Sequence, residues 1–518
     1  MNDKPKSRWY WRWLRRGLIA LAVLATLIAV AITEENWRGK RDWEDYKRQA
    51  AARGDLLEET ATNNIPDDQN FAKAPIFAAL AAMQWNVKEG DWEPRDTNVV
   101  DRAKMSVARW DGTWPEHANG DWNRGRLTDL KAWQTYYRTA PTNSSASSNS
   151  EGRVLRVPIS TNSSAADVLL ALGIYDAAIE ELRTDSQRPF SRFGNYDWAN
   201  PQSMSLNLVY LSEMKGFCSV LQLRAIAELA ADQNSKALDD IELLLRLNDK
   251  LRQEPLLITH LVSLATMNLA LQPIYEGLAQ HKWSEAQLAE LEQTLAAKDF
   301  LVDYQTAMRG ERAFAISALD DMRLTREYKT EDDSSGTGKV TTISFRLVPS
   351  AFFYQNELTV ARIHEQFFLP LVDLEKRIVS PSAQRQASVA LAEEAKHYQP
   401  YKILALMSAQ AITKTVEKFA VVQSQTDFAR IACALERYRL ARGSYPEALD
   451  ALAPQFIEAI PHDVINGQPL HYRRTEDGNF LLYSVGWNET DDQGQIVANK
   501  TGGIDREKGD WVWRYPVK

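Results

Sequence analysis

The chain has 518 residues, 44% of them hydrophobic and 25% charged, a balance typical of folded globular proteins and, at about 150 residues per domain, enough for three to four domains. This composition excludes a wholly disordered chain, a collagen-like chain and a membrane protein with many spans. A formal charge of −8 argues against a general nucleic-acid-binding protein, which needs a basic face to neutralise phosphates. Two cysteines, Cys218 and Cys433, cannot build a disulfide scaffold or a cysteine-rich zinc site.

The amino terminus predicts a membrane helix. Residues 17–32 (GLIALAVLATLIAVAI) carry no charge, and the 16 residues before them hold six basic side chains and one acid, a charge of +5. Tryptophans flank the run on both sides, as is typical of membrane interfaces, and a basic flank favours the cytoplasmic side. We therefore expect residues 1–36 to form a cytoplasmic foot and a single span of a bacterial inner membrane. The other 502 residues, which carry −13, would then be periplasmic.

A cleaved signal peptide is the alternative interpretation of the same residues. Ala29-Val30-Ala31 is an A-x-A pattern of the kind found at signal-peptide cleavage sites. A mature chain shorter than the full sequence by about 31 residues would show that cleavage occurs.

Three further regions follow in chain order. Residues 37–163 read as a charged stalk and an irregular, tryptophan-rich segment that contains a low-complexity loop at 142–152. Residues 164–400 predict an α-helical body, because apolar residues recur at steps of three and four. Residues 401–518 predict an α+β module. The expected fold is thus mainly α, with a transmembrane helix at one end and a small antiparallel sheet at the other.

Several features of the body predict specific structure. Residues 204–231 and 235–251 predict a helical hairpin, and Ser284 with Gln287 predicts a capping box. The 17 residues between Pro255 and Pro273 are apolar but include six polar side chains, which favours a helix buried in protein over one in lipid. One otherwise apolar helix carries four charged residues that predict a partly buried, structural ion network: Asp303, Arg309, Glu311 and Arg312.

The carboxyl-terminal pattern predicts a long helix followed by short strands. The helix covers 401–442 and ends at Gly443, a residue typical of helix termini. Strands are expected at 470–474, 480–485 and 511–515, with Asp477-Gly478 as a hairpin turn.

Four segments of this module carry a family resemblance: ALERYRLARGSYPEALDAL, IPHDVINGQPLHYRR, FLLYSVGWNETDDQG and GDWVWRYP. They resemble the soluble domain of the major pseudopilin of type II secretion, over about the last 120 residues. The whole chain also resembles a group of large bacterial single-pass membrane proteins without an established activity, through NWRGKRDWEDYK, DDQNFA and MRGERAFAI. The chain departs from the pseudopilins at Ala22, where they carry a glutamate five residues after the cleavage glycine.

The resemblance implies a calcium site. Pseudopilins bind calcium in the loop after the Tyr-Ser-x-Gly strand, and hard cations take carboxylate and carbonyl oxygens. The corresponding candidate ligands here are Asn488, Asp491, Asp492, Asp505 and Asp510. A solvated acidic loop is the alternative, since the segment also contains Lys500, Arg506 and Lys508. No other cofactor is expected.

Catalytic motifs are absent from the sequence. His364-Glu365 begins like a zinc-binding H-E-x-x-H motif, but position 368 is Phe, and Gly336–Lys339 lacks the residues of a phosphate loop. Tryptophans of the irregular region raise the idea of glycan binding, with burial in a loop-rich layer as the alternative: Trp85, Trp92, Trp110, Trp114, Trp122 and Trp133.

We therefore expect a non-catalytic scaffold or interaction protein of the cell envelope. Its expected partners are the membrane and envelope or secretion proteins, and nucleic acid is not among them. Two alternatives remain: an envelope hydrolase whose site is assembled from distant residues, and a divergent secretion pseudopilin.

Overall fold

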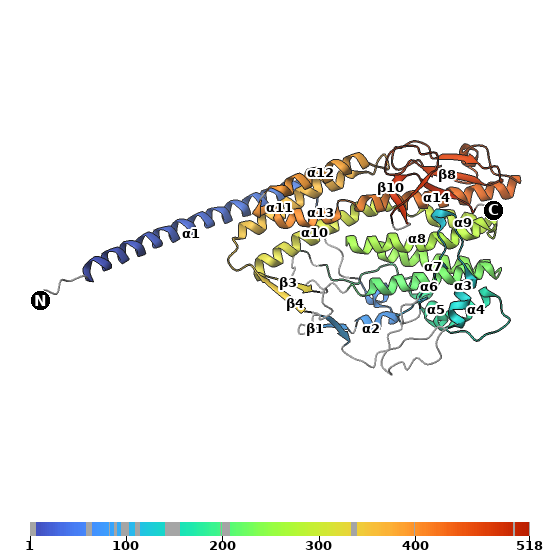
Figure 1. Ribbon diagram of the computed structural model, residues 1–518, viewed down its shortest axis with the longest axis horizontal. Helices are drawn as coiled ribbons and strands as arrows, with labels where there is room; N and C mark the ends of the chain where they lie inside the picture. Colours follow the sequence, from blue (N-terminus) through green and yellow to red (C-terminus); the bar gives the residue numbers. More distant parts are fainter. Residues whose placement is uncertain are drawn as a thin grey trace.

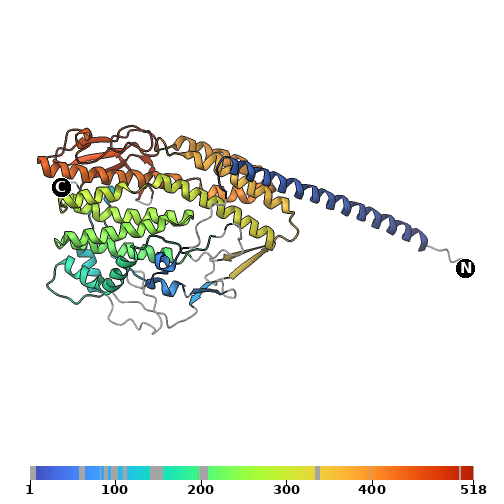
Figure 2. The same ribbon diagram turned by 180° about the vertical axis from the view of Figure 1, so that it is seen from behind.

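The computed structural model describes residues 7–57, 65–81, 83–86, 91–94, 103–108, 114–139, 156–196, 198, 208–332, 339–397, 399–500 and 503–516. Within these ranges the protein is mainly helical, as expected. One long helix projects from a body of stacked helices, and the carboxyl-terminal strands lie along one side of that body (Figures 1 and 2). The low-complexity loop at 142–152 and Trp110 lie outside the described residues.

The helices have the following bounds: α1 Ser7–Ala52, α2 Ala78–Ala81, α3 Leu130–Arg138, α4 Ser164–Leu172, α5 Asp176–Asp185, α6 Tyr210–Ala230, α7 Asn234–Arg252, α8 Leu257–Ala279, α9 Glu285–Ala296, α10 Phe300–Thr325, α11 Ser350–Ile363, α12 Pro381–Lys396, α13 Ile403–Ile412 and α14 Thr415–Arg442. The strands are β1 Met83–Asn86, β2 Asp91–Pro94, β3 Glu327–Asp332, β4 Lys339–Ser344, β5 Val372–Asp373, β6 Ile378–Val379, β7 His471–Arg474, β8 Phe480–Ser484, β9 Ile496–Ala498, β10 Ile504–Gly509 and β11 Trp511–Arg514.

Helix α8 lies at the centre of the body and packs against α6, α7, α10 and α14. Two-thirds of its most apolar window is buried inside the protein, which confirms the prediction of a core helix. A neighbouring helix contacts two of its polar groups: the Asn248 amide of α7 donates to the Ser263 carbonyl at 2.6 Å and to the Thr266 hydroxyl at 2.9 Å. The predicted hairpin is α6–α7, and the capping box at Ser284 and Gln287 is present.

The carboxyl-terminal module contains the predicted sheet. Strand β8 lies between β11 and β7, and both pairings are antiparallel. Gly443 ends α14 in the left-handed region, with φ +84°. The predicted single helix over 401–442 is divided into α13 and α14, because Thr413 and Lys414 interrupt it. The β9–β10 hairpin was not predicted.

The predicted regions share one hydrophobic core. Trp43 of α1 and Trp513 of β11 belong to the same cluster of buried side chains. The expected boundary after residue 36 lies inside α1, so the anchor and the stalk form one element. Strands β3 and β4 form an antiparallel pair that runs from Glu327 and Ser344 to Asp332 and Lys339.

Candidate functional site

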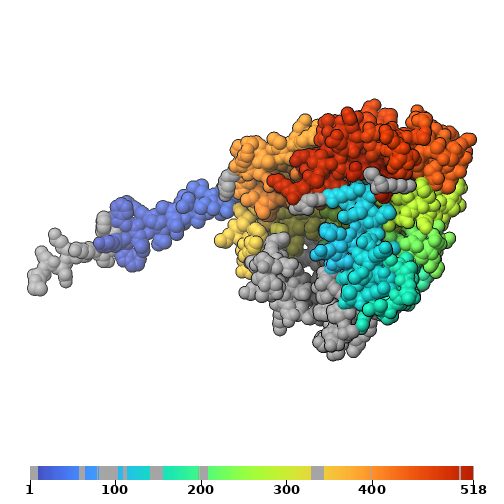
Figure 3. Space-filling view, turned by 45° about the vertical axis from the view of Figure 1, so that its right-hand side comes forward, coloured from blue at the N-terminus to red at the C-terminus, as the bar shows by residue number. Residues whose placement is uncertain are grey.

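Helix α1 changes character along its length. From Tyr10 to Ile32 its side chains are exposed on all sides, and its window is long and apolar enough to cross a membrane, although a signal sequence passes the same test. This part stands clear of the body (Figure 3). The next residues are in contact with it: the Tyr401 hydroxyl donates to the Glu35 carboxylate, and the Ala351 amide donates to the Asn36 side chain at 2.8 Å.

The second part of α1 packs against α11 and against the turn His364–Phe368 that follows α11. Trp43, Tyr46 and Ala50 are buried at helical spacing. The Tyr46 hydroxyl donates to Glu365 Oε2 at 2.6 Å, and Arg53 donates to Glu365 Oε1 at 2.8 Å. Glu365 lies in a π-helical turn, His364–Phe368, a distortion that is frequent at functional positions. Here it presents one carboxylate to Tyr46 of α1 and to Arg53 just after α1.

A buried ion pair fixes the chain just after α1. Arg312 of α10 is fully buried, and its two terminal nitrogens donate to the two Asp55 carboxylate oxygens at 2.8 and 2.7 Å. Burial alone would raise the pKa of Asp55, but the hydrogen bonds and charge of Arg312 outweigh it and lower the pKa below its usual value. Such bidentate pairs of arginine and carboxylate are strong hydrogen-bonded pairs with a defined geometry.

Two of the four charged residues predicted on α10 pair with residues outside this helix. Arg312 holds Asp55, whereas Asp303 accepts from Arg252 of α7. Burial raises the pKa of Asp303 to about 6 although Arg252 opposes the shift. The partners, Asp55 and Arg252, lie far away in the sequence, so spacing alone could not identify them.

The candidate calcium ligands are hydrogen-bonded to one another and to the backbone. The Asn488 amide donates to Asp492 at 2.8 Å. Asp510 is buried, and its two oxygens accept from the backbone amides of Asp492 and Gly494 at 3.2 and 2.6 Å. Burial raises the pKa of Asp510, against the effect of these donors.

The other two candidate ligands have their own partners. Asp491 accepts from the backbone amide of Gln493, and Asp505 pairs with Lys508 at 3.3 Å. In the part of the chain that the structure describes, no group of three or more His, Cys, Asp or Glu side chains is arranged to hold a metal ion. The calcium site stays a prediction, and the observed geometry is that of a hydrogen-bonded loop.

The motifs that carry the pseudopilin resemblance contact one another. Asp463, from the Pro-x-Asp segment, is buried and accepts from the Ser484 hydroxyl at 2.9 Å and the Val485 amide at 3.0 Å. Asp463 thereby joins the segment IPHDVINGQPLHYRR to the segment FLLYSVGWNETDDQG. Glu436 of α14 accepts from the Tyr445 hydroxyl at 2.8 Å. These residues have a structural role in this module.

Glu436 also connects the module to the helical body. His281, just after α8, and Arg439 both donate to its carboxylate, at 2.8 and 2.6 Å. Burial opposes ionisation of Glu436, but these donors and Tyr445 outweigh it and lower its pKa to about 2.

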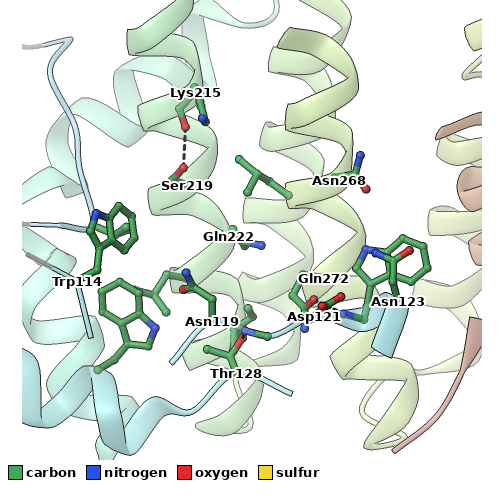
Figure 4. A pocket seen from close by; sticks show the side chains of 17 residues that line it. Trp114, Asn119, Asp121, Asn123, Thr128, Lys215, Ser219, Gln222, Asn268 and Gln272 are labelled. Atoms are coloured by element: carbon green, nitrogen blue, oxygen red, sulfur yellow. Dashed lines mark hydrogen bonds between the residues drawn. The ribbon is translucent and has the colours of Figure 1, made fainter. Parts of the chain in front are cut away.

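A pocket of about 380 Å³ lies between α6, α8 and the segment around residues 114–128 (Figure 4). Lys215, Ser219 and Gln222 come from one face of α6, at spacings of four and three, and Asn268 and Gln272 come from successive turns of α8. The third wall carries Trp114, Asn119 and Thr128, and Trp133 of α3 also lines the pocket.

The segment that forms the third wall is held by side chains of α8. Gln272 accepts from the Trp122 backbone amide at 2.9 Å, and Thr128 donates to Glu276 through both its amide and its hydroxyl. Gly120 leaves the space that this requires, because a Cβ there would lie 2.1 Å from the Gln272 amide nitrogen. The pocket is therefore formed by three stretches that lie far apart in the sequence, and α8 fixes the position of its third wall. Trp114 and Trp133 stand out in the sequence, but the pocket could not be predicted from it, since no local motif connects its walls.

Comparisons of the chain with models of protein families, with curated proteins and with solved structures found no match.

Proposed function

We propose that this protein is a single-pass bacterial inner-membrane protein that holds a rigid periplasmic body close to the membrane surface. In this proposal it acts as a non-catalytic scaffold for envelope or secretion proteins. The observation that carries it is the continuity of α1, which leaves its exposed apolar stretch and enters the core of the body without a break.

Distance along the helix supports the position of the body. The last apolar residue of the stretch is Ile32, and Asn36 already contacts the start of α11. Four residues of α-helix advance about 6 Å, which is about the thickness of a lipid headgroup layer. The start of α11 and the loop before it would therefore lie at the membrane surface.

The loop before α11 has side chains that suit a membrane surface. Leu347 is 97% exposed, and the Arg346 side chain beside it is 77% exposed. An exposed leucine next to an arginine pairs apolar area with a cation that anionic headgroups attract. Figures 1 and 2 show this part of the chain, between β4 and α11, at the end of the body from which α1 projects.

The orientation is supported by charge. The +5 charge of the first 16 residues favours their retention in the cytoplasm. A helix whose second part is fixed to the body by buried contacts transmits position and orientation, which is what a scaffold requires.

Single cysteines would test the topology. Both native cysteines are fully buried, so the wild-type chain supplies a low labelling background. A Ser7→Cys variant reports the amino-terminal side, and Ile159→Cys, at a side chain 85% exposed, reports the body. In intact cells with a permeabilised outer membrane, we expect an impermeant maleimide to label Ile159→Cys but not Ser7→Cys. The reverse pattern, or release of the body as a shortened chain, would contradict the proposal.

Partner capture would test the scaffold role. Crosslinking followed by purification of the full chain from membranes should yield envelope or secretion proteins in fixed ratio. A purified protein that cleaves envelope glycans or peptides without a partner would instead show the hydrolase alternative. Loss of membrane filaments on deletion would favour the pseudopilin alternative.

A further inference from the structure

We propose that the pocket between α6, α8 and residues 114–128 binds a neutral saccharide of one or two rings. The volume of about 380 Å³ lies within the range usual for small-molecule sites. The proposal goes beyond the scaffold role and does not rest on it, because the pocket lies in the body and needs no membrane.

The charge of the lining excludes an anionic ligand such as a phosphate. Lys215 is the one basic residue among the lining side chains in the described part of the chain, and Asp121 is the one acidic residue there. Asp121 lies 3.5 Å from Arg124, which reduces its field. Anion sites in proteins use several cations or converging backbone amides, and the pocket offers neither.

The polar lining also excludes a purely apolar ligand. Amide side chains face the pocket from all three walls: Asn119 and Gln222 form no hydrogen bond through their side chains within the described residues, and Asn268 donates only to its own helix, at 3.0 Å. An apolar ligand would bury these groups without hydrogen-bond partners, which is unfavourable. Each amide both donates and accepts, and this matches a hydroxyl group, which does the same. In Figure 4, Gln222 lies between Asn119 on one side and Asn268 on the other.

Trp114 provides a surface on which a sugar ring can stack. Its side chain is 51% exposed at the pocket, although large aromatic residues are usually buried. It meets the buried ring of Trp133 edge to face, with centroids 6.0 Å apart, so it is supported from behind. The buried indole N–H of Trp133 has no hydrogen-bond partner among the described residues. The C–H face of a pyranose ring is apolar while its edge is hydroxylated, and one aromatic face bordered by amides fits both.

The test measures binding of N,N′-diacetylchitobiose and of maltose to the full chain by calorimetry. The protein is kept in lipid nanodiscs, since maltoside detergents would compete for the pocket. We expect saturable binding of at least one disaccharide. Trp114→Ala should weaken it about tenfold, because loss of a stacking contact worth about 1.4 kcal/mol lowers affinity by that factor. Trp114→Phe should restore most of the affinity, and Gln222→Ala should weaken binding severalfold.

Trp37→Ala is the matched control, because Trp37 is a tryptophan of similar exposure on α1, 62%, outside the pocket. It should bind as the wild type does.

Sedimentation with insoluble chitin separates two sources of the same chemistry: co-sedimentation supports a glycan chain, and binding of the soluble disaccharide alone supports a free sugar. Three results would overturn the proposal: no heat with either disaccharide, unchanged affinity in both Trp114→Ala and Gln222→Ala, or heat with inorganic phosphate only.

Discussion

The two halves of α1 are built for different surroundings. From Gly17 to Ile32 the helix carries no charge and exposes its side chains on every side. From Glu35 to its end it is rich in charge, yet it buries Trp43, Tyr46 and Ala50 against the body. A helix that is apolar all round needs an apolar solvent, whereas a charged helix with one apolar stripe needs a protein partner.

The charged half is fixed to the body by the Tyr46–Glu365 hydrogen bond, and the chain just after it is fixed by the Arg53–Glu365 and Asp55–Arg312 pairs. The body therefore follows the orientation of the apolar half. Substitutions that remove these contacts should affect folding, while substitutions in the apolar half should not.

The largest effect is expected from Asp55→Asn. The substitution leaves the fully buried Arg312 without a counter-charge, which should lower the free energy of unfolding by about 3–5 kcal/mol. Asp45→Asn is the control on α1, ten residues before Asp55, where an exposed pair with Arg48 is worth at most about 1 kcal/mol. Denaturant unfolding of the purified chain measures both. Equal, small losses would mean that the pair does not hold α1 to the body.

The same pair predicts a pH dependence. Because the pKa of Asp55 is lowered in the folded protein, its contribution is complete above the unfolded value of about 3.9 and is lost as pH falls through the folded value. The difference in stability between wild type and Asp55→Asn should therefore shrink as pH falls below about 4. Unfolding measured from pH 7 to pH 3 checks this. A difference that stays constant, or grows, on acidification would contradict it.

A smaller effect is expected where α1 crosses α11. A Cβ at Gly39 would lie 3.2 Å from the Ala351 Cα, so Gly39→Leu should push the helices apart and cost about 1–3 kcal/mol. Gly17→Leu is the matched change in the apolar half, where nothing lies within 4 Å of a Cβ, and it should leave the body unchanged. Hydrogen exchange of α11 reads out both variants. Faster exchange of α11 in Gly17→Leu, or unchanged exchange of α11 in Gly39→Leu, would contradict the difference between the two halves.

The smallest effect is expected from Tyr46→Phe. It removes one hydrogen bond to Glu365 but retains the buried ring and the Arg53 contact, so it should cost about 0.5–1.5 kcal/mol. Thermal unfolding in parallel with Tyr46→Ala, which also removes the ring, is the comparison. If the phenylalanine variant loses as much stability as the alanine variant, the hydroxyl rather than the packing holds this half.

Local sequence patterns were sufficient for elements whose stabilising contacts are local. The turn at Asp477-Gly478, the helix end at Gly443 and the Ser284–Gln287 capping box depend on neighbours within a few residues, and all were predicted. The exposed apolar helix followed from composition alone.

Contacts between distant residues could not be predicted in the same way. Residues 37–52 read as a solvated stalk because charges dominate them, although Trp43, Tyr46 and Ala50 share one face at steps of three and four. Nothing local indicates that this face meets α11, about 300 residues later in the chain. The pocket shows the same limit, since Trp114 was noticed as one tryptophan among many and Gln222 and Asn268 carried no signal at all.

If α1 holds the body against the membrane surface, the exposed Leu347 side chain lies among the lipid headgroups. A Leu347→Cys variant labelled with an environment-sensitive dye, in nanodiscs that contain lipid with a spin label near the headgroup, should show strong quenching. Ile159→Cys, at a side chain that is also largely exposed (85%) but lies in another part of the body, serves as the control and should show little quenching. Equal, weak quenching at both positions would contradict a body held at the membrane by α1.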